Sequence, residues 1–256
     1  MYKINFLNTK NFYSFKIDNF LSKEIYEEID YNFPNFHELI DKKKDLKNRG
    51  NQKYAISSSS NYYYELINKR KIFNEFFKQI SSKEFFFEIY NQIFIKVLLS
   101  KVSNFKDTIK LLRLSKFSSE RNKLEKFIFK NVKINHEISF LTNGAFLEPH
   151  TDSRSKICSI MIYFPSKDKL NEIEIEKEKQ IGTQFWESKL NNYNNDDYKY
   201  FNSIFENKSS RGIKTSFEKY NAYGFLKNSY SWHSVDKINV NKEYVRRSIN
   251  INLNYY

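Results

Sequence analysis

Residues 140–165 read FLTNGAFLEPHTDSRSKICSIMIYFP, an extended segment that ends in a polar corner and is followed by a dense apolar run. In a β-strand, side chains two residues apart point to the same face. His150 and Asp152 therefore project together, while Thr151 points away. One imidazole and one carboxylate on one face are two of the three ligands that a non-haem iron(II) site uses. The corner is thus a candidate metal site that lacks one ligand.

Length and composition indicate one large domain with a sizeable core. The chain has 256 residues, of which 40% are hydrophobic, and Phe and Tyr are unusually abundant at 25 and 19 residues. Chains of this length can fold as a single domain. Only 5 Gly and 3 Pro are present, which argues against a long disordered linker. We therefore expect a single domain that spans residues 1–256.

Cysteine usage and the apolar segments predict a soluble, cytoplasmic protein that does not engage a membrane. Cys158 is the one cysteine, so an intramolecular disulfide and a cysteine-based zinc site are excluded. The first residues, MYKINFLNTKNFYSFK, are broken by Asn and Lys and lack the apolar core of a signal peptide. The most apolar segment, residues 85–99, is too short and too polar to span a bilayer.

The formal net charge is +13, from 43 basic and 30 acidic residues. A basic chain can attract an anionic partner such as nucleic acid. Here, however, Lys, Asn, Ile, Phe and Tyr are all abundant while Ala and Gly are scarce, and the lysines are spread along the chain. That pattern is typical of a compositional bias of a whole proteome, and it does not favour a nucleic-acid interface.

The pattern along the chain predicts helices first and strands afterwards. Ser22 can cap a helix that has Glu24 in its first turn. Residues 85–99 carry apolar side chains at the spacing of one buried helical face. We expect residues 1–131 to be a mainly helical support region and residues 132–256 to hold the strands. This order predicts an α+β fold in which the strands close a sandwich or barrel.

The strand-forming half contains a long polar excursion. Residues 157–163 are apolar on both faces, as expected for a strand that is covered on both sides. Residues 166–220 are polar and irregular, and we expect an insertion there with short strands at 172–176 and 183–186. An excursion of this length is often a lid or a substrate-contacting region.

The chain has four histidines, and two of them are expected to be structural. His37 follows a proline in a polar region and should lie at the surface, and His136 lies in the strand before the corner. His233 begins a strand among apolar residues, where a lone histidine is more often a buried structural residue than a ligand. Its place downstream of His150 and Asp152 makes it the candidate for the missing third ligand.

The last strand supplies a binding site for a carboxylate. Alternation along residues 246–253 separates two faces, one with Arg247 and three aliphatic residues, the other with Arg246, Ser248, Asn250 and Asn252. An Arg and a Ser two residues apart can bind one carboxylate together. Iron(II) with three protein ligands leaves positions open for a chelating keto acid and dioxygen. Arg246 is placed to bind the far carboxylate of that acid.

This set of residues resembles the Fe(II)/2-oxoglutarate-dependent dioxygenases, particularly their prolyl hydroxylase-like branch. The residues that carry the resemblance are Gly144, Pro149-His150-Thr151-Asp152, Ile160-Met161-Ile162-Tyr163, Trp232-His233-Ser234-Val235 and Arg246-Arg247-Ser248-Ile249. The resemblance covers about residues 133–256 without the insertion. It implies a double-stranded β-helix, or jelly-roll, core with supporting N-terminal helices.

The resemblance also implies roles for individual residues. His150, Asp152 and His233 would hold iron at the catalytic centre. Arg246 would pair with the C5 carboxylate of 2-oxoglutarate, and Ser248 would assist it. Tyr163 stands where a tyrosine often bonds the same carboxylate, with a core aromatic as the alternative.

Two positions depart from the family pattern. Phe140 stands where a second tyrosine is common, so that contact is lost or supplied elsewhere. The spacing from His233 to Arg246 is longer than usual, which leaves Arg247 as a possible substitute, although the face argument favours Arg246.

The implied reaction is hydroxylation of an unactivated C–H bond in a small molecule, saccharide or peptide. It would consume dioxygen and decarboxylate 2-oxoglutarate to succinate, with ascorbate as an auxiliary reductant. Asp152 occupies the position that halogenating relatives vacate, which favours hydroxylation. Three alternatives remain open: an oxidative nucleic-acid dealkylase of the same superfamily, a non-catalytic jelly-roll binding module, and a zinc hydrolase that uses the same three ligands.

Overall fold

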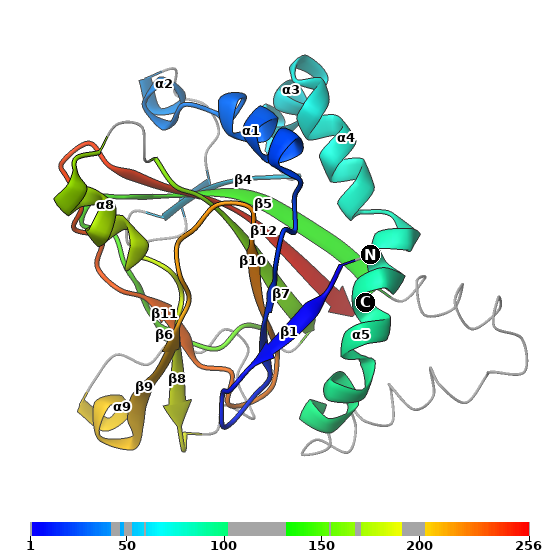
Figure 1. The fold of residues 1–256 in the computed structure, drawn as a ribbon, viewed down its shortest axis with the longest axis vertical. Helices are drawn as coiled ribbons and strands as arrows, with labels where there is room; N and C mark the ends of the chain where they lie inside the picture. The colour runs from blue at the N-terminus through cyan, green and yellow to red at the C-terminus, as the bar shows by residue number, and fades with distance from the viewer. Residues whose placement is uncertain are drawn as a thin grey trace, which may run out of the picture.

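The computed structural model describes residues 2–41, 47–48, 53–58, 60–101, 132–153, 155–166, 170–190 and 203–255. Within them the chain forms two antiparallel sheets, with the helices of the N-terminal half gathered on one side, so the expected α+β class is confirmed (Figure 1). The strands are β1 (Ile4–Leu7), β2 (Ser14–Ile17), β3 (Lys47–Asn48), β4 (Lys53–Ser57), β5 (Val132–Thr142), β6 (Leu147–His150), β7 (Lys156–Phe164), β8 (Gln184–Ser188), β9 (Ser209–Lys214), β10 (Ala222–Leu226), β11 (His233–Val235) and β12 (Val245–Tyr255).

The larger sheet has eight strands in the order β1-β2-β10-β7-β12-β5-β4-β3, and the smaller has four in the order β6-β11-β8-β9. The polar corner and the candidate third ligand therefore lie in the smaller sheet. The arginine-bearing strand β12 lies near the centre of the larger sheet, hydrogen-bonded to β5 and β7. Two facing sheets form the core of the fold, as expected for a jelly-roll.

The N-terminal half supplies the helices expected from its pattern. Ser22 caps the first helix, where its side chain accepts a hydrogen bond from the Ile25 amide. The apolar segment 85–99 lies within α5, and its buried residues include Phe86, Ile89 and Ile93. The helices are α1 (Lys23–Tyr31), α2 (Phe36–Asp41), α3 (Asn61–Lys69), α4 (Lys71–Ile80), α5 (Lys83–Lys101), α8 (Glu172–Lys179) and α9 (Ser203–Lys208).

The two faces of the eight-stranded sheet pack against different partners. On the outer face, apolar side chains such as Ile162 and Ile249 form one cluster with residues of α1, α4 and α5. Figure 1 shows these helices on one side of the sheet and the four-stranded sheet on the other. On the inner face, Met161 and Phe225 form a second cluster with residues of the smaller sheet such as Phe185. The space between the sheets is where the functional residues gather.

Helix α1 is fixed to the sheet by polar contacts as well as by packing. The Tyr26 hydroxyl donates to the Tyr163 carbonyl at 2.9 Å, and the Tyr26 ring stacks on Phe164 with centroids 4.9 Å apart. Arg247 reaches Asp30 of the same helix at 2.8 Å. The helical support therefore holds the outer surface of the strands whose inner surface lines the cavity.

One expected strand is a helix. Residues 172–176, EIEIE, alternate with the period of a strand but form the start of α8. Asn171 and Glu174 form a reciprocal capping box that satisfies the first amides of a helix, and acidic residues lie in its first turn. Ile173 is 69% exposed, so no buried face enforces the alternation. Local capping therefore overrides the period-two pattern.

The expected insertion at 166–220 is only partly an excursion. The strand expected at 183–186 is confirmed as β8, and β8 pairs with both β11 and β9. Residues 184–188 and 209–214 thus belong to the smaller sheet of the core. The expected lid falls in part on residues 191–202, which lie outside the described residues.

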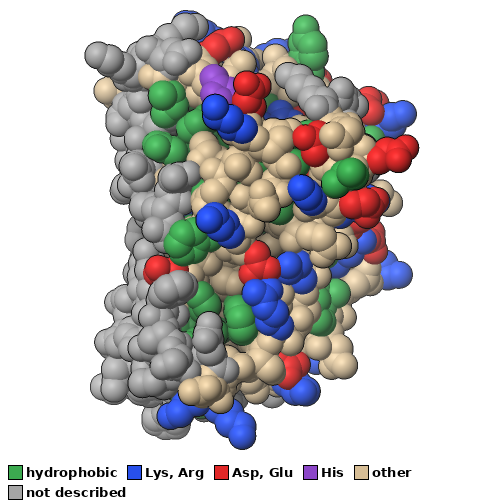
Figure 2. All heavy atoms as spheres, turned by 90° about the vertical axis from the view of Figure 1, so that its left-hand side faces the viewer, with side chains coloured by type: hydrophobic (Ala, Val, Ile, Leu, Met, Phe, Trp, Pro, Cys, Tyr) green, Lys and Arg blue, Asp and Glu red, His purple; other side chains and the backbone are tan. Residues whose placement is uncertain are grey.

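Within the described residues, no helix is long and apolar enough to cross a bilayer. Figure 2 shows one face of the molecule, on which basic and acidic side chains are interspersed. Mixed charge of this kind is typical of a solvated surface. On this face, the net positive charge of the chain does not gather into a patch for a polyanion.

Candidate metal centre

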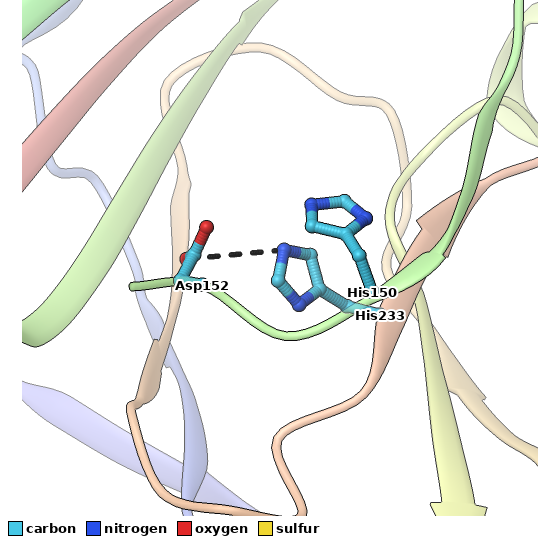
Figure 3. Close-up of side chains that lie close together, drawn as sticks. All are labelled: His150, Asp152 and His233. Atoms are coloured by element: carbon cyan, nitrogen blue, oxygen red, sulfur yellow. Dashed lines mark ion pairs between the residues drawn. The ribbon is translucent and has the colours of Figure 1, made fainter. Parts of the chain in front are cut away.

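Strand pairing brings the three predicted ligands together. His150 ends β6, His233 begins β11, and the two residues are directly opposite each other in the smaller sheet. Asp152 follows two residues after His150, and Figure 3 shows its carboxylate facing the His233 ring. One ligand atom from each of the three residues lies within 4.8 Å of the others. The Nε2 atom of His233 is 3.9 Å from Oδ2 of Asp152.

Backbone carbonyls orient both imidazoles. Nδ1 of His150 lies 2.7 Å from the Glu148 carbonyl, and Nδ1 of His233 lies 3.0 Å from the Ser231 carbonyl. A carbonyl only accepts, so Nδ1 must carry the proton in each ring and donate it. The lone pair is then on Nε2 in both histidines. This is how proteins prepare imidazoles to hold a metal ion.

The protonation states suit a cation. Burial, with His150 as a nearby unfavourable charge, lowers the pKa of His233 to about 3, and burial also lowers the pKa of His150. Burial alone would raise the pKa of Asp152, but Lys156 and the two histidines outweigh it and hold that pKa well below its ordinary value. At neutral pH the centre is therefore two neutral imidazoles and one carboxylate, which are the ligand forms that a divalent metal requires.

Two further residues hold the Asp152 carboxylate. Lys156 reaches Oδ2 at 3.0 Å, and the Ser159 hydroxyl lies 3.1 Å from the same oxygen and 2.9 Å from Asn252 Oδ1, so these two acceptors share its one hydrogen. Both partners come from β7, the strand that follows the corner. The carboxylate is thus oriented from the larger sheet, while the two imidazoles are oriented from the smaller one.

Arg246 lies in the same cavity as the three ligands and is 4% exposed. Its Nε donates to the Ile181 carbonyl at 2.9 Å, and its guanidinium lies 5.0 Å from the Tyr163 ring and 5.1 Å from the Phe217 ring. Among the described residues, no carboxylate lies within ion-pair distance of it. A buried guanidinium without an anionic partner is costly, and a bound anion would compensate it.

Two hydroxyls beside Arg246 also lack partners. Ser248 of β12 and Ser139 of β5 are cross-strand neighbours, and both side-chain oxygens are buried without a hydrogen bond. Such groups are rare in folded proteins, and they mark places where a ligand or a water molecule completes the bonding. Ser139, Arg246 and the three metal ligands line one cavity of about 90 Å³, which exceeds the space of a few waters.

Each predicted site residue has a definite place. Ser248 faces inward and Arg247 faces the helices, so the two arginines lie on opposite faces as the alternation predicted, and the role of Arg246 as the carboxylate anchor stays a prediction. Tyr163 lies behind Arg246, and its hydroxyl is within 2.9 Å of Thr183 Oγ1 and 3.0 Å of Thr215 Oγ1. A direct bond from Tyr163 to a co-substrate stays a prediction, whereas its ring supports the guanidinium.

The remaining predicted positions lie elsewhere. Phe140 packs on the outer face against Phe33 and Phe36, so the inward residue next to it in sequence is Ser139. His37 is exposed and lies in α2. His136 stacks on Phe77 with centroids 4.1 Å apart, on the outer face. His37 is thus at the surface as expected, and His136 packs on the side of the sheet away from the cavity.

Sequence reasoning missed several residues of the cavity. They are Lys53, Glu137, Ser139, Lys156 and Ser159. The polar members of β5 could have been found, since Glu137 and Ser139 alternate with apolar Ile138 and Phe140 in the period of a strand. Lys156 contacts Asp152 because of the conformation of the chain between them, and no sequence pattern predicts that contact.

Comparison with known proteins shows the fold. No model of a known protein family matches the chain, and no curated protein gives a significant match in sequence. A solved structure of the epimerase SnoN in complex with Fe3+, alpha ketoglutarate and nogalamycin RO aligns over 96% of this chain and 80% of that one, with a TM-score of 0.50 and 8% identity. The chain therefore shares the fold of that enzyme.

Two prolyl hydroxylase structures also align. One is the prolyl-4-hydroxylase of Pseudomonas putida, with a TM-score of 0.42, 8% identity, and coverage of 95% of this chain and 92% of that one. The other is a prolyl hydroxylase of Trichoplax adhaerens in complex with a hypoxia inducible factor peptide fragment, with a TM-score of 0.42, 11% identity, and coverage of 97% and 86%.

Proposed function

We propose that this chain is an iron(II)- and 2-oxoglutarate-dependent dioxygenase that hydroxylates an unactivated C–H bond. The observation that carries the proposal is the shared cavity, which holds a His-Asp-His ligand set and, apart from it, a buried arginine without an anionic partner. A metal site alone would also suit a zinc hydrolase or a binding module. The uncompensated Arg246 and the two partnerless hydroxyls are explained by a dicarboxylic co-substrate.

The ligand set fits iron(II). Two neutral imidazoles and one carboxylate on one face form the facial triad that leaves positions open for co-substrate and dioxygen. His150, Asp152 and His233 would hold the ion, and an iron(II) ion in this place would supply the activation of dioxygen that the reaction needs. The carbonyls of Glu148 and Ser231 keep both rings in the ligating orientation, and Lys156 and Ser159 do so for the carboxylate.

The co-substrate site would lie on the inner face of β12. Arg246 would pair with the C5 carboxylate of 2-oxoglutarate, and Ser248 would donate to it. Ser139, opposite Ser248 on β5, would donate as well, in place of the hydroxyl that a tyrosine supplies in the family. The rings of Tyr163 and Phe217 hold the guanidinium from behind and keep water away from it.

The oxidised substrate belongs to the small molecules, saccharides or peptides. The SnoN structure contains nogalamycin RO, and the Trichoplax structure contains a peptide, so related folds accept ligands of very different kinds. The described face with interspersed charges does not favour nucleic acid.

Binding and turnover test the proposal separately. Anaerobic calorimetry should show 2-oxoglutarate binding to the iron-loaded protein, and aerobic incubation should release succinate. His150→Ala should lower metal affinity by more than about 100-fold, because a lost ligand exceeds the effect of a lost supporting contact. His37→Ala, at the exposed histidine, is the matched control and should leave both readouts unchanged. Absence of 2-oxoglutarate binding to the wild-type protein would refute the proposal.

A further inference from the structure

The cavity has a polar wall that neither the metal nor the proposed co-substrate uses. It is formed by Lys53 of β4, Glu137 of β5, and Asn250 and Asn252 of β12, which all line the cavity. These residues come from three adjacent strands of the larger sheet. We refer to them as the polar wall.

The polar wall is electrically neutral and well buried. Lys53 Nζ donates to Glu137 Oε1 at 3.1 Å, and the two side chains are only 18% and 14% exposed. Asn250 Nδ2 donates to the same oxygen at 3.2 Å. A charged ligand group placed here would face an ion pair that is already matched, so one of the two partners would oppose it. The wall therefore favours a neutral ligand.

The polar wall still offers hydrogen bonds of both kinds. Within the described chain, neither the Asn250 carbonyl oxygen nor the Asn252 amide nitrogen has a hydrogen-bond partner. One is an acceptor and the other a donor, two residues apart on one strand. A hydroxyl both donates and accepts, so adjacent hydroxyl groups complement such a surface.

The wall is continuous with the metal ligands. Ser159 Oγ lies 3.1 Å from Asp152 Oδ2 and 2.9 Å from Asn252 Oδ1, so a single hydroxyl separates the two sites. A ligand held on the polar wall would thus have atoms close to the metal. This position suits the molecule that is oxidised.

The smaller sheet adds apolar surface to the cavity beside the metal ligands. Leu147 and Val235 are paired across β6 and β11 of that sheet, and both line the cavity. The cavity therefore combines the hydrogen-bonding groups of the polar wall with C–H surface from the facing sheet. A pyranose ring or a polyol has this same division between hydroxyl groups and C–H groups.

We propose that the polar wall is the subsite for the oxidised substrate and that it selects a neutral polyhydroxylated group, such as a sugar ring or an open-chain polyol. This inference rests on the proposed function, because the metal centre defines which end of the cavity reacts. Glu137 and the two asparagines would bind the hydroxyls, while Leu147 and Val235 of the facing sheet would cover the C–H face. Lys53 keeps the Glu137 carboxylate in place.

Paramagnetic relaxation tests the inference without turnover. The protein is loaded with Mn(II) and 2-oxoglutarate, and proton relaxation is measured for methyl α-D-glucopyranoside, sorbitol, gluconate and glucosamine. The first two probes distinguish a ring from an open chain. The last two each replace one oxygen-bearing position with a charge: gluconate is sorbitol with a carboxylate at C1, and glucosamine is glucose with an ammonium group at C2. We expect at least one neutral probe to relax strongly, and both charged probes to bind about tenfold more weakly.

Variants assign the effect to the wall. Glu137→Gln removes one negative charge and leaves Lys53 without an ionic partner. The neutral probe should then bind about tenfold more weakly, while gluconate should bind more tightly. Asn254→Ala is the matched control, because Asn254 lies farther along the same face of β12 and does not line the cavity. Calorimetry with 2-oxoglutarate on each variant verifies that the fold and the co-substrate site are intact.

The possible failures are distinguishable. If 2-oxoglutarate binds but neither neutral probe relaxes, the subsite assignment is wrong and the proposed function stands. If Glu137→Gln weakens 2-oxoglutarate binding and leaves the sugar signal unchanged, the wall belongs to the co-substrate and the inference is also wrong. If the wild-type protein does not bind 2-oxoglutarate, the proposed function fails and this inference fails with it.

Discussion

Arg246 and Arg247 are adjacent on β12, yet they face opposite sides of the eight-stranded sheet and have opposite surroundings. Arg247 faces the helices, where it pairs with Asp30 at 2.8 Å and lies over the Phe33 ring. Arg246 faces the second sheet, where it has a backbone carbonyl and two rings around it but no carboxylate among the described residues. The positive charge of Arg247 is thus balanced by a carboxylate of the fold, whereas that of Arg246 is not balanced within the described residues.

The difference extends to the rest of the two faces. The outer face is filled by aliphatic and aromatic side chains that bind the helices to the sheet. The inner face contains a metal-ligand set, a buried cation, two partnerless hydroxyls and a cavity. Polar groups that cost stability persist where they serve a ligand. The outer face therefore stabilises the fold, and we attribute the inner face to function.

Replacing each arginine separately with methionine tests the difference between the two faces most directly. Arg246→Met should weaken 2-oxoglutarate binding about 100-fold, because a charge-assisted double hydrogen bond is lost. Its free energy of unfolding should stay the same or rise, since an uncompensated buried cation is removed. Arg247→Met should show the reverse pattern, with unchanged 2-oxoglutarate affinity and a loss of about 1–2 kcal/mol of stability. Calorimetry and denaturant unfolding measure the two quantities, and equal effects of both variants on affinity would contradict the assignment of faces.

His136 provides a pH test of the outer face. Burial lowers its pKa to about 4, while the unfolded chain binds the proton near the ordinary value of 6.5. Between these values the unfolded state holds more protons, so stability falls as the pH decreases. From pH 7 to pH 5 this group should account for a loss of about 2 kcal/mol in the free energy of unfolding.

His136→Gln isolates that contribution from those of the other buried histidines. The variant should be less stable at pH 7, because the ring stacked on Phe77 is lost. Its stability should nevertheless depend less on pH than that of the wild type over the same range. Urea unfolding at several pH values gives both slopes. Parallel curves for the two proteins would show that folding does not lower the pKa of His136.

Much of the fold and of the metal centre could be predicted from the sequence, because both depend on local periodicity. The period of a strand places His150 and Asp152 on one face, and it separates Arg246 from Arg247. The capped helix after Ser22 and the buried face of residues 85–99 follow from helical spacing in the same way. These features need only neighbours in the chain.

Features that depend on pairing between distant strands could not be predicted. Ser139 lies beside Arg246 because β5 pairs with β12 in a register that only the complete sheet determines. Residues 184–188 were expected in an insertion, although β8 is an integral strand of the smaller sheet. Residues 172–176 show the converse case, in which local capping by Asn171 outweighs a misleading alternation.

Lys156 provides a test on the inner face, because its ammonium group lies 3.0 Å from Oδ2 of the metal-ligand candidate Asp152. A divalent metal at the same carboxylate is repelled by the ammonium group. Lys156→Met should therefore bind Mn(II) about tenfold more tightly, since one like charge near the metal is removed. The metal-free variant should unfold more easily, so the rise in Tm on adding metal should be larger than in the wild type.

The matched control for this variant is Lys179→Met, which breaks an ion pair with Glu176 on the exposed surface of α8. Exposed pairs contribute little, so metal affinity and its effect on Tm should match those of the wild type. If Lys156→Met instead bound Mn(II) more weakly, the lysine would be needed to hold Asp152 in its ligating position.

The smallest effect concerns the two partnerless hydroxyls. Ser139→Ala and Ser248→Ala each remove a neutral donor from the proposed carboxylate site, and each should weaken 2-oxoglutarate binding about threefold. Neither change should reduce the free energy of unfolding, because the hydroxyls bond to nothing in the described structure and alanine removes a buried polar group that has no partner. Ser14→Ala, at a buried serine of β2 that does not itself line the cavity, is the control and should leave affinity unchanged. If either variant lost free energy of unfolding but kept its affinity for 2-oxoglutarate, that hydroxyl would stabilise the fold. The inner face would then have a structural role at this position, as the outer face does.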